Sequence, residues 1–529
     1  MNCGNYRGIS VINGLAKCYD YLLNNRLTKW FTPSREQEGA QKKRGCIEHI
    51  VALRLLIDRC MQQKSPLFIV FIDFSKAYDR VPRSYLLNRL RQLGCGRVML
   101  MALASMYWIT RFLLGTTPIT AVLGVKQGSP TSFFLFILYV DELVKLLKCF
   151  PLEGFLQWLH VLMLMDDTVI VATSRGKLCE KLNVLVKWCN RSGMVINEEK
   201  TEFMGFNCSV GDRKSILVST NAGDISVNHC SSYKYLGAIF TSDGKIESSV
   251  DKHADSRVNC INKLVRFLDK NKNAPYSVKK RVLDACVFSS LLYGCEAWLT
   301  EKSFTKINVM YMKAIKMMLG VRSSTTNDVC LLEAGYPSLD ALIKSRQKTF
   351  FEKMILEREN MEDDPLMHSI RITRNENPVL SRYIDSLLNH EGDIIETDLK
   401  NRMRRVQSST RTKSITYRLI NPSFEVHSIY KGSSNIDDYL RVAFTRLRTA
   451  SHRLRIETGR WSRIKRERRL CQCGGGVQTE QHVLCDCELV RGIRERYGCE
   501  GINFDSFMQD DKANYELLML YEMLNVLEN

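Results

Sequence analysis

The stretch that most constrains this chain is Leu162–Ala172, LMLMDDTVIVA, where two adjacent carboxylates interrupt an apolar run. Both flanks are short and rich in residues that favour strands, whereas aspartate favours turns, so the pattern predicts a strand, a tight turn and a second strand. Asp166 and Asp167 at the tip of a buried hairpin are costly, because like charges resist joint ionisation and burial adds a desolvation penalty. Two hypotheses follow: a bound cation compensates the charge, or the turn is simply solvated.

A second apolar stretch that ends in an acid lies upstream, at residues 67–79, LFIVFIDFSKAYD. Two strands that bring Asp73 and Asp166 to one edge of a sheet would form an oxygen-rich site suited to Mg²⁺. Phosphoryl transfer with two metal ions uses such a site, since one ion activates the attacking hydroxyl and both stabilise charge on the reacting oxygens. The alternative is that each aspartate merely ends a strand or a turn.

Further motifs accompany these two stretches in a regular order. The series reads NYRGIS at 5–10, QEG at 37–39, RGC at 44–46, FIDFSKAYDRVP at 71–82, GVKQGSPTS at 124–132, LMDD at 164–167, NEEKT at 197–201 and YKYLG at 233–237. This series resembles the reverse transcriptase of non-LTR (LINE-type) retrotransposons. The resemblance covers at least residues 5–345 and continues more faintly to about 490. Met1 lies only a few residues before the first motif, so we expect a protein truncated at its N-terminus relative to this family.

The resemblance implies an α+β fold of right-hand polymerase type, with fingers and a palm built on an antiparallel sheet and a helical thumb. A mainly helical, basic C-terminal region with a small zinc-type motif would follow. The resemblance also implies roles for individual residues. The catalytic and Mg²⁺-binding acids would be Asp73, Asp166 and, as a less direct ligand, Asp167, with Lys200 as a general acid toward pyrophosphate. The nucleotide-binding residues would be Arg7, Arg44, Tyr78, Gln127 and Gly128, and the primer grip would be Tyr235, Leu236 and Gly237.

Each of these roles has a plainer alternative. Lys42 and Lys43, beside Arg44, also fit a solvated basic loop, and Lys200 fits a surface lysine in a polar turn. Tyr78 would exclude a 2′-hydroxyl if it lies beneath the nucleotide sugar, but a core tyrosine has the same appearance in sequence. The chain departs from the family at Leu164, where relatives mostly have tyrosine, and at Phe133, where they usually have proline.

Hydrophobic periodicity predicts the elements around these motifs. Helical spacing of apolar residues is found at 15–27, 80–93, 133–147 and 178–190, and 245–347 is mostly helical. A short strand begins at Met194–Ile196, and Tyr233–Phe240 reads as one strand that ends in the turn Ser242–Gly244. The dense apolar run Ser289–Trp298 indicates core packing.

Charge and cysteine usage restrict the setting. The net charge of +19 and pI near 9.2 favour a polyanionic partner, because Lys and Arg that neutralise phosphates release counterions. The 19 cysteines form no compact disulfide pattern, no secretory signal opens the chain, and no apolar run approaches a membrane span. We therefore expect a reducing, intracellular location, in the nucleus or the cytoplasm, as a ribonucleoprotein.

The sequence divides into six predicted regions. They are fingers and palm at 1–245, a helical thumb and extension at 246–350, a linker or loosely packed region at 351–398, a basic nucleic-acid-binding region at 399–470, a zinc-knuckle-like motif at 471–490 and a helical tail at 491–529. The basic region interleaves arginines with Tyr417, Phe444 and Trp461, a mixture that suits RNA or single-stranded DNA, where phosphates attract and bases stack.

Three thiols and one imidazole follow directly after the basic region. Cys471, Cys473, His482 and Cys487 make a ligand set for tetrahedral Zn²⁺, with Cys485 as a rival for the last position. The spacing Cys-x-Cys is tighter than the usual Cys-x-x-Cys, but the resemblance to the Cys-Cys-His-Cys segment near the end of LINE proteins favours this set. Reduced structural cysteines are the alternative.

Together these features predict an RNA-directed DNA polymerase that copies retrotransposon RNA into DNA with two Mg²⁺ ions and possible use of Zn²⁺. Its partners would be an RNA template, a DNA primer or target and deoxynucleoside triphosphates, with any endonuclease supplied by another protein. The alternative is a catalytically impaired retroelement remnant that only binds nucleic acid. The retained acids favour the enzyme, whereas Leu164 and the short N-terminus favour the remnant.

Overall fold

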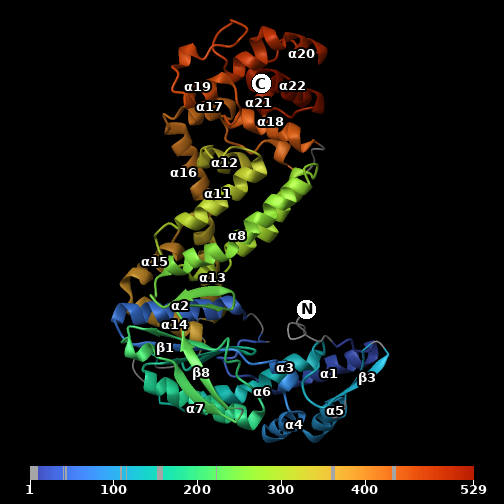
Figure 1. Cartoon of the computed structure of the whole chain (residues 1–529), viewed down its shortest axis with the longest axis vertical. Coiled ribbons are helices and arrows are strands. Elements are labelled where there is room, and N and C mark those ends of the chain that lie inside the picture. Colours follow the sequence, from blue (N-terminus) through green and yellow to red (C-terminus); the bar gives the residue numbers. More distant parts are fainter. Residues whose placement is uncertain are drawn as a thin grey trace. The chain divides into compact units, whose positions relative to one another are not determined.

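The computed structural model describes residues 10–39, 41, 44–107, 110–114, 116–151, 156, 159–221, 223–358, 361, 364–431 and 436–528 (Figure 1). The chain forms two compact units. Unit 1 comprises Met1–Ser249, Glu296–Leu299 and Phe350–Asp385, and unit 2 comprises Val250–Cys295, Thr300–Thr349 and Ser386–Asn529. No helix among the described residues is long and apolar enough to cross a membrane.

Unit 1 is built on a six-stranded sheet with strand order β4-β5-β1-β6-β8-β7. The strands are β4 Val161–Leu164, β5 Asp167–Ala172, β1 Leu67–Ile72, β6 Glu202–Phe206, β8 Gly223–His229 and β7 Ile216–Thr220. Described pairings are antiparallel except that of β6 with β8, which is parallel. All six residues of β1 are buried, because helices cover both faces of the sheet; Figure 1 shows α2 (Cys46–Gln63) on one face and α7 (Arg175–Ser192) on the other.

The helices predicted in the first half of the chain are present, with shifted ends. They are α1 Gly14–Trp30, α4 Arg83–Gln92, α6 Pro130–Lys148 and α7, joined by the shorter α3 Ala77–Arg80 and by α5 Arg97–Tyr107. Local caps explain the shifts: the Ser174 side chain accepts a hydrogen bond from the Lys177 N–H at the start of α7, and Gly193 ends it in the left-handed region. A separate hairpin pairs β2 Thr110–Leu114 with β3 Thr117–Ala121.

Two strand predictions are wrong. Residues 233–240 do not form one strand but a hairpin of β9 Ser232–Tyr235 and β10 Ala238–Thr241. Leu236 and Gly237 turn the chain between them, with positive φ angles of 47° and 88° that an extended strand does not have. Met194–Ile196 likewise forms no strand, because only an isolated bridge joins Ile196 to Phe74.

The described part of 351–398 differs from the predicted linker. It contains the end of α13 Leu339–Arg358, then α14 Pro365–Glu376, α15 Pro378–Leu388 and the start of α16 Ile394–Ser408. Within unit 1, α14 packs against α2. Its N-cap Asp364 is fully buried and pairs with Arg44 and Arg358. At least one acidic residue of this region is therefore buried in an ion-pair network.

Unit 2 is helical, as predicted for 245–347 and for the basic region. Its helices include α8 Ile246–Lys270, α9 Tyr276–Val282, α11 Thr305–Leu319, α12 Asn327–Ala334, α17 Thr412–Ile420, α18 Asp438–Arg448, α19 Arg455–Trp461, α20 Arg491–Arg496, α21 Phe504–Gln509 and α22 Asn514–Glu528. The predicted core run Ser289–Trp298 does contribute buried residues, among them Leu291 and Leu292 in unit 2 and Trp298 in unit 1.

Candidate active site and metal centre

The three candidate acids lie at one edge of the main sheet. Asp73 follows the last residue of β1, while Asp166 lies in the turn between β4 and β5 and Asp167 is the first residue of β5. The register pairs Ile72 with Thr168, which places Asp73 opposite Asp167 at the next position. The predicted strand, turn and strand around Asp166 are thus confirmed, and the fold brings the two acidic stretches together.

A cavity of about 850 Å³ opens at this edge. Asp73 and Asp166 both line it. The predicted residues Tyr78, Gln127, Gly128 and Lys200 line it as well, and so does Asn197. The carboxylates supply only oxygen donors, which is the ligand type that Mg²⁺ prefers in sites shared with substrate phosphates. The residues present therefore fit a magnesium site, with Asp73 and Asp166 as the protein ligands and Asp167 beside them.

The Asp73 carboxylate is held by the chain segment that follows α7. Asn197 donates from Nδ2 to Oδ2 of Asp73 at 2.9 Å, and the Asp73 N–H donates to Thr201 Oγ1 at 3.3 Å. Lys200 Nζ lies 3.8 Å from Oδ2 of Asp73, with two thirds of its side chain exposed. Asn197 lies in the NEEKT motif, but the sequence alone predicted no role for it. Its position in the same motif as Lys200 was the signal that could have indicated a place near the acids.

Tyr78, Gln127 and Gly128, which the resemblance assigns to nucleotide binding, also line the cavity. The ring of Tyr78 stacks on Phe136, with centroids 4.4 Å apart and planes 13° apart. Gln127 donates from Nε2 to Asp79 at 3.2 Å, and Gly128 has a φ of 111°, which only glycine adopts readily. The stack on buried Phe136 fixes the orientation of the Tyr78 ring. Tyr78 therefore packs against the core and also lines the cavity.

One of the predicted nucleotide contacts does not line the cavity. Arg44 pairs with Glu38 at 2.9 Å and with Asp364 at 2.6 Å, its side chain is only 7% exposed, and it does not line the cavity. The carboxylates on both sides of the guanidinium leave it little capacity for a triphosphate. Arg7 lies outside the described residues.

The predicted primer grip lies in the hairpin of β9 and β10. Tyr235 is buried, 3.3 Å from His49 through its hydroxyl, while Leu236 and Gly237 form the turn. Tyr233 instead stacks on Phe71 at 4.1 Å and donates to the Lys200 carbonyl at 3.0 Å. Burial raises the pKa of the Tyr233 hydroxyl, and the charges of Asp73 and Asp167 raise it further. Tyr233 is thus a neighbour of Lys200 and of the acids to which the sequence interpretation gave no separate role.

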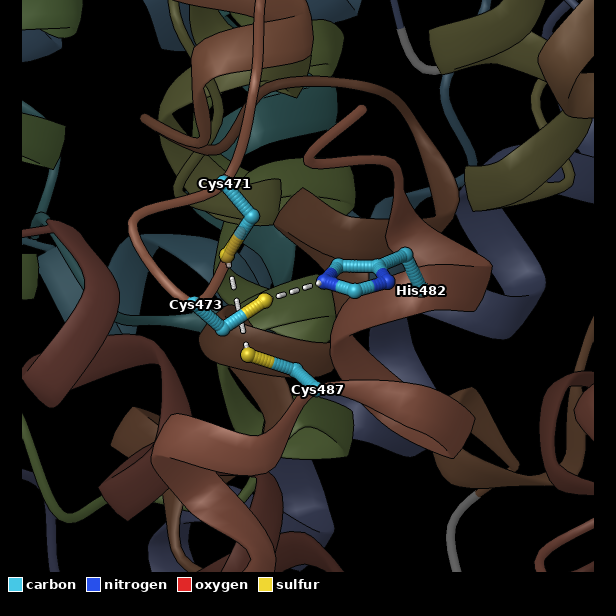
Figure 2. A group of neighbouring side chains, drawn as sticks. All are labelled: Cys471, Cys473, His482 and Cys487. Atoms are coloured by element: carbon cyan, nitrogen blue, oxygen red, sulfur yellow. Dashed lines mark hydrogen bonds between the residues drawn. The ribbon is translucent and has the colours of Figure 1, made fainter. Parts of the chain in front are cut away.

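The predicted zinc ligands form a compact cluster in unit 2. Figure 2 shows Cys471, Cys473, His482 and Cys487 pointing toward one another, and their ligand atoms all lie within 4.8 Å. The Sγ atoms of Cys471 and Cys487 are 3.6 Å apart, and Cys473 Sγ lies 3.2 Å from His482 Nε2. A tetrahedral zinc ion with Zn–S bonds of about 2.3 Å needs sulfur atoms roughly 3.8 Å apart. The four residues fit such an ion, whereas the rival Cys485 is not part of this cluster of described residues.

Hydrogen-bond donors lie beside two of the four predicted ligands. The Gly475 N–H donates to Cys473 Sγ at 3.3 Å and helps to lower the pKa of that thiol to about 7, whereas burial raises the pKa of Cys487 to about 12. A low thiol pKa favours the thiolate that binds zinc. Gln478 donates from Nε2 to Cys471 Sγ at 3.8 Å, a contact that would hold this ligand in place around a metal ion.

Comparison with known proteins identifies the first part of the chain. Residues 1–240 match the family described as reverse transcriptase (RNA-dependent DNA polymerase). These residues therefore form a reverse transcriptase domain, and the curated relatives place it with those of non-LTR retrotransposons.

The curated relatives are distant. The probable RNA-directed DNA polymerase from transposon BS of Drosophila melanogaster is 24% identical over 59% of this chain and 36% of its own length. The Pol polyprotein of the type-1 retrotransposable element R2 of Popillia japonica is 24% identical over 62% of this chain and 47% of its own length. This chain thus spans less than half of either relative. Among solved structures, the apo telomerase of Candida tropicalis is 14% identical over 73% of this chain and 60% of its own, with a TM-score of 0.33, too low to define a shared fold.

Proposed function

We propose that this chain is an RNA-directed DNA polymerase that copies an RNA template into DNA by two-metal nucleotidyl transfer. The observation that carries the proposal is the convergence of Asp73 and Asp166 on one cavity within a reverse transcriptase domain. In a right-hand polymerase the main sheet of unit 1 would be the palm and the helices that follow it the thumb. Bound Mg²⁺ would activate the primer hydroxyl and offset charge on the reacting oxygens.

The residues around the acids serve the same reaction. Asn197 holds the Asp73 carboxylate in one orientation through its 2.9 Å hydrogen bond. Tyr78, fixed by its stack on Phe136, excludes a 2′-hydroxyl by bulk, and Gln127 hydrogen-bonds the incoming nucleotide or template. Lys200, exposed at the cavity, donates a proton to the departing pyrophosphate.

Unit 2 provides nucleic-acid contacts beyond the active site. Several arginines of the basic region are buried and structural: Arg402 pairs with Asp398, Arg441 with Asp438 and Arg448 with Glu333. The contacts therefore come from the exposed run Trp461–Arg468. There the Arg322 guanidinium lies 4.1 Å from the centre of the Trp461 ring, which remains 51% exposed. A ring backed by a cation and surrounded by basic residues suits single-stranded RNA or DNA.

Zn²⁺ held by Cys471, Cys473, His482 and Cys487 would fix the fold of the segment that follows this basic run. The DNA primer would come from a nick made by another protein, and the chain would act as a ribonucleoprotein in the nucleus or the cytoplasm.

Primer extension on an RNA template tests the proposal. Purified full chain with Mg²⁺ and deoxynucleotides is compared with Asp166→Ala and with Asp224→Ala, which removes an exposed acid elsewhere on the sheet. We expect extension by wild type and by Asp224→Ala, and none by Asp166→Ala. If folded wild type binds primer and template but extends nothing, the enzyme is refuted and the binding remnant, which Leu164 favours, is the better description.

A further inference from the structure

The segment Glu36–Glu38 lies beside the strand that leads into the acidic turn. The Met163 N–H donates to the Glu36 carbonyl at 2.8 Å, and the Glu38 N–H donates to the Met163 carbonyl at 3.0 Å. These two hydrogen bonds form a parallel bridge between Gln37 and Met163. A segment far upstream in the sequence thereby extends the sheet beyond β4.

The side chain of Gln37 reaches from this bridge to the turn itself. Its Oε1 accepts from the Met165 N–H at 2.9 Å and from the Gly39 N–H at 3.0 Å, while its Nε2 donates to the Met165 carbonyl at 3.2 Å. Gln37 is fully buried. One amide side chain thus binds both backbone groups of the residue directly before Asp166.

Met165 needs such support because its backbone is in an unfavourable region. Its φ of 61° lies in the left-handed region, which residues other than glycine rarely adopt. This angle sets the direction in which the chain leaves β4 and therefore where Asp166 projects. Backbone strain of this kind persists only where the surroundings hold it in place.

We propose that Gln37 is a positioning residue for the catalytic acids: it holds the Met165 backbone so that Asp166 projects into the cavity before metal or substrate binds. The inference rests on the proposed polymerase function. Gln37 touches neither metal nor nucleotide and acts only through the turn.

The rest of the QEG motif supports the same contact. A Cβ atom at Gly39 would lie 2.6 Å from Met165 Sδ and 2.9 Å from Gln37 Oε1, so any larger residue here would have to displace one of these two side chains. Glu38 anchors the segment from the other side through its 2.9 Å pair with Arg44, with both side chains buried. The motif therefore has one function in all three residues, which is to hold the turn.

The test uses Gln37→Met, which keeps the length of the side chain but cannot form the three hydrogen bonds. Gln347→Met is the matched control, because Gln347 is equally buried and donates to a backbone carbonyl, that of Cys295, within unit 2. Each full-length variant is measured by hydrogen exchange of the peptide 161–170 without metal, by Mn²⁺ titration and by primer extension, after melting curves establish that it is folded.

For Gln37→Met we expect faster hydrogen exchange at the turn. We also expect the Mn²⁺ dissociation constant to rise and the extension rate to fall, each by about 10- to 100-fold, which is the range typical for residues that hold metal ligands in place. Gln347→Met should leave all three readouts unchanged. Unchanged exchange and unchanged Mn²⁺ affinity in folded Gln37→Met would overturn the inference. Absence of extension by wild type would refute only the polymerase, because exchange and Mn²⁺ binding do not require it.

Discussion

Replacement of Asp364 by alanine tests whether α14 is an integral part of unit 1. The Asp364 carboxylate is fully buried, pairs with Arg44 at 2.6 Å and lies 3.7 Å from Arg358, whose side chain is 3% exposed. The same carboxylate accepts hydrogen bonds from the Leu366 and Met367 N–H groups as the N-cap of α14. Asp364→Ala therefore removes a helix cap and leaves two buried cations with less compensation.

The two losses differ in size. Removal of one partner from a buried ion pair costs about 3–5 kcal/mol, and loss of an N-cap costs about 1 kcal/mol. We therefore expect Asp364→Ala to lower the free energy of unfolding of unit 1 by about 4–6 kcal/mol. The control is Asp393→Ala, which removes an exposed N-cap of α16 that accepts from the Ile395 N–H, and so should cost only about 1 kcal/mol.

Urea denaturation followed by tryptophan fluorescence and circular dichroism measures both values. Equal losses for Asp364→Ala and Asp393→Ala would refute the reasoning, because the buried charge network would then contribute nothing. That result would also restore the interpretation of this region as loosely packed.

Three further predictions concern the metal cluster, a buried acid and the basic run. Chelation of zinc, or Cys487→Ser, should lower the melting temperature of unit 2, while Cys485→Ser should not, as thermal scans with and without chelator can show. Burial raises the pKa of Glu38 to about 7. The stability contributed by the protonated Glu38 carboxyl is therefore greatest below the pKa of the unfolded chain, near 4.5, and is lost as the pH rises through 7. Glu38→Gln should accordingly gain stability relative to wild type, on the order of 3 kcal/mol, between pH 4.5 and 8 in urea titrations. Trp461→Ala should weaken binding of single-stranded RNA by about 1–3 kcal/mol without changing the slope of affinity against salt, whereas loss of the salt slope would indicate a charge contact instead.

Local signals were sufficient for the elements that carry the acids. Asp73 and Asp166 each stand next to a short apolar run, and such runs between polar residues have few alternatives to a buried strand. The cluster of Cys471, Cys473, His482 and Cys487 was also predictable, because thiols and an imidazole gathered in 17 residues can converge through one Gly-rich turn. In both cases the decisive contacts follow from residues near one another in sequence, or from motifs whose order was already informative.

The contacts that sequence reasoning missed join segments that are far apart in the chain. Arg44 pairs with Asp364, which is 320 residues away, and a basic loop residue shows no sign in sequence that it meets a buried acid. Gln37 contacts Met165 over 128 residues, and its partners are backbone groups, which no side-chain pattern reveals. Arg402, Arg441 and Arg448 belong to the predicted nucleic-acid-binding region but are buried, and charge composition does not distinguish a solvated arginine from a buried one.

The prediction of one strand over 233–240 was wrong for a geometric reason, and the difference also affects the candidate active site. A single strand over 233–240 would continue without reversal, whereas the left-handed Leu236 and Gly237 fold β10 back onto β9. Tyr233 and Tyr235 share one strand face because strand side chains alternate with a period of two, and both rings contact Phe71 of β1, at 4.1 Å and 5.8 Å. The Tyr235 hydroxyl hydrogen-bonds with His49. The Tyr233 hydroxyl instead donates to the Lys200 carbonyl and lies close enough to Asp73 for that charge to raise its pKa. The hairpin is thus attached to the sheet through Phe71, two residues before Asp73, so a change in how β9 packs would move the tyrosine that supports Lys200.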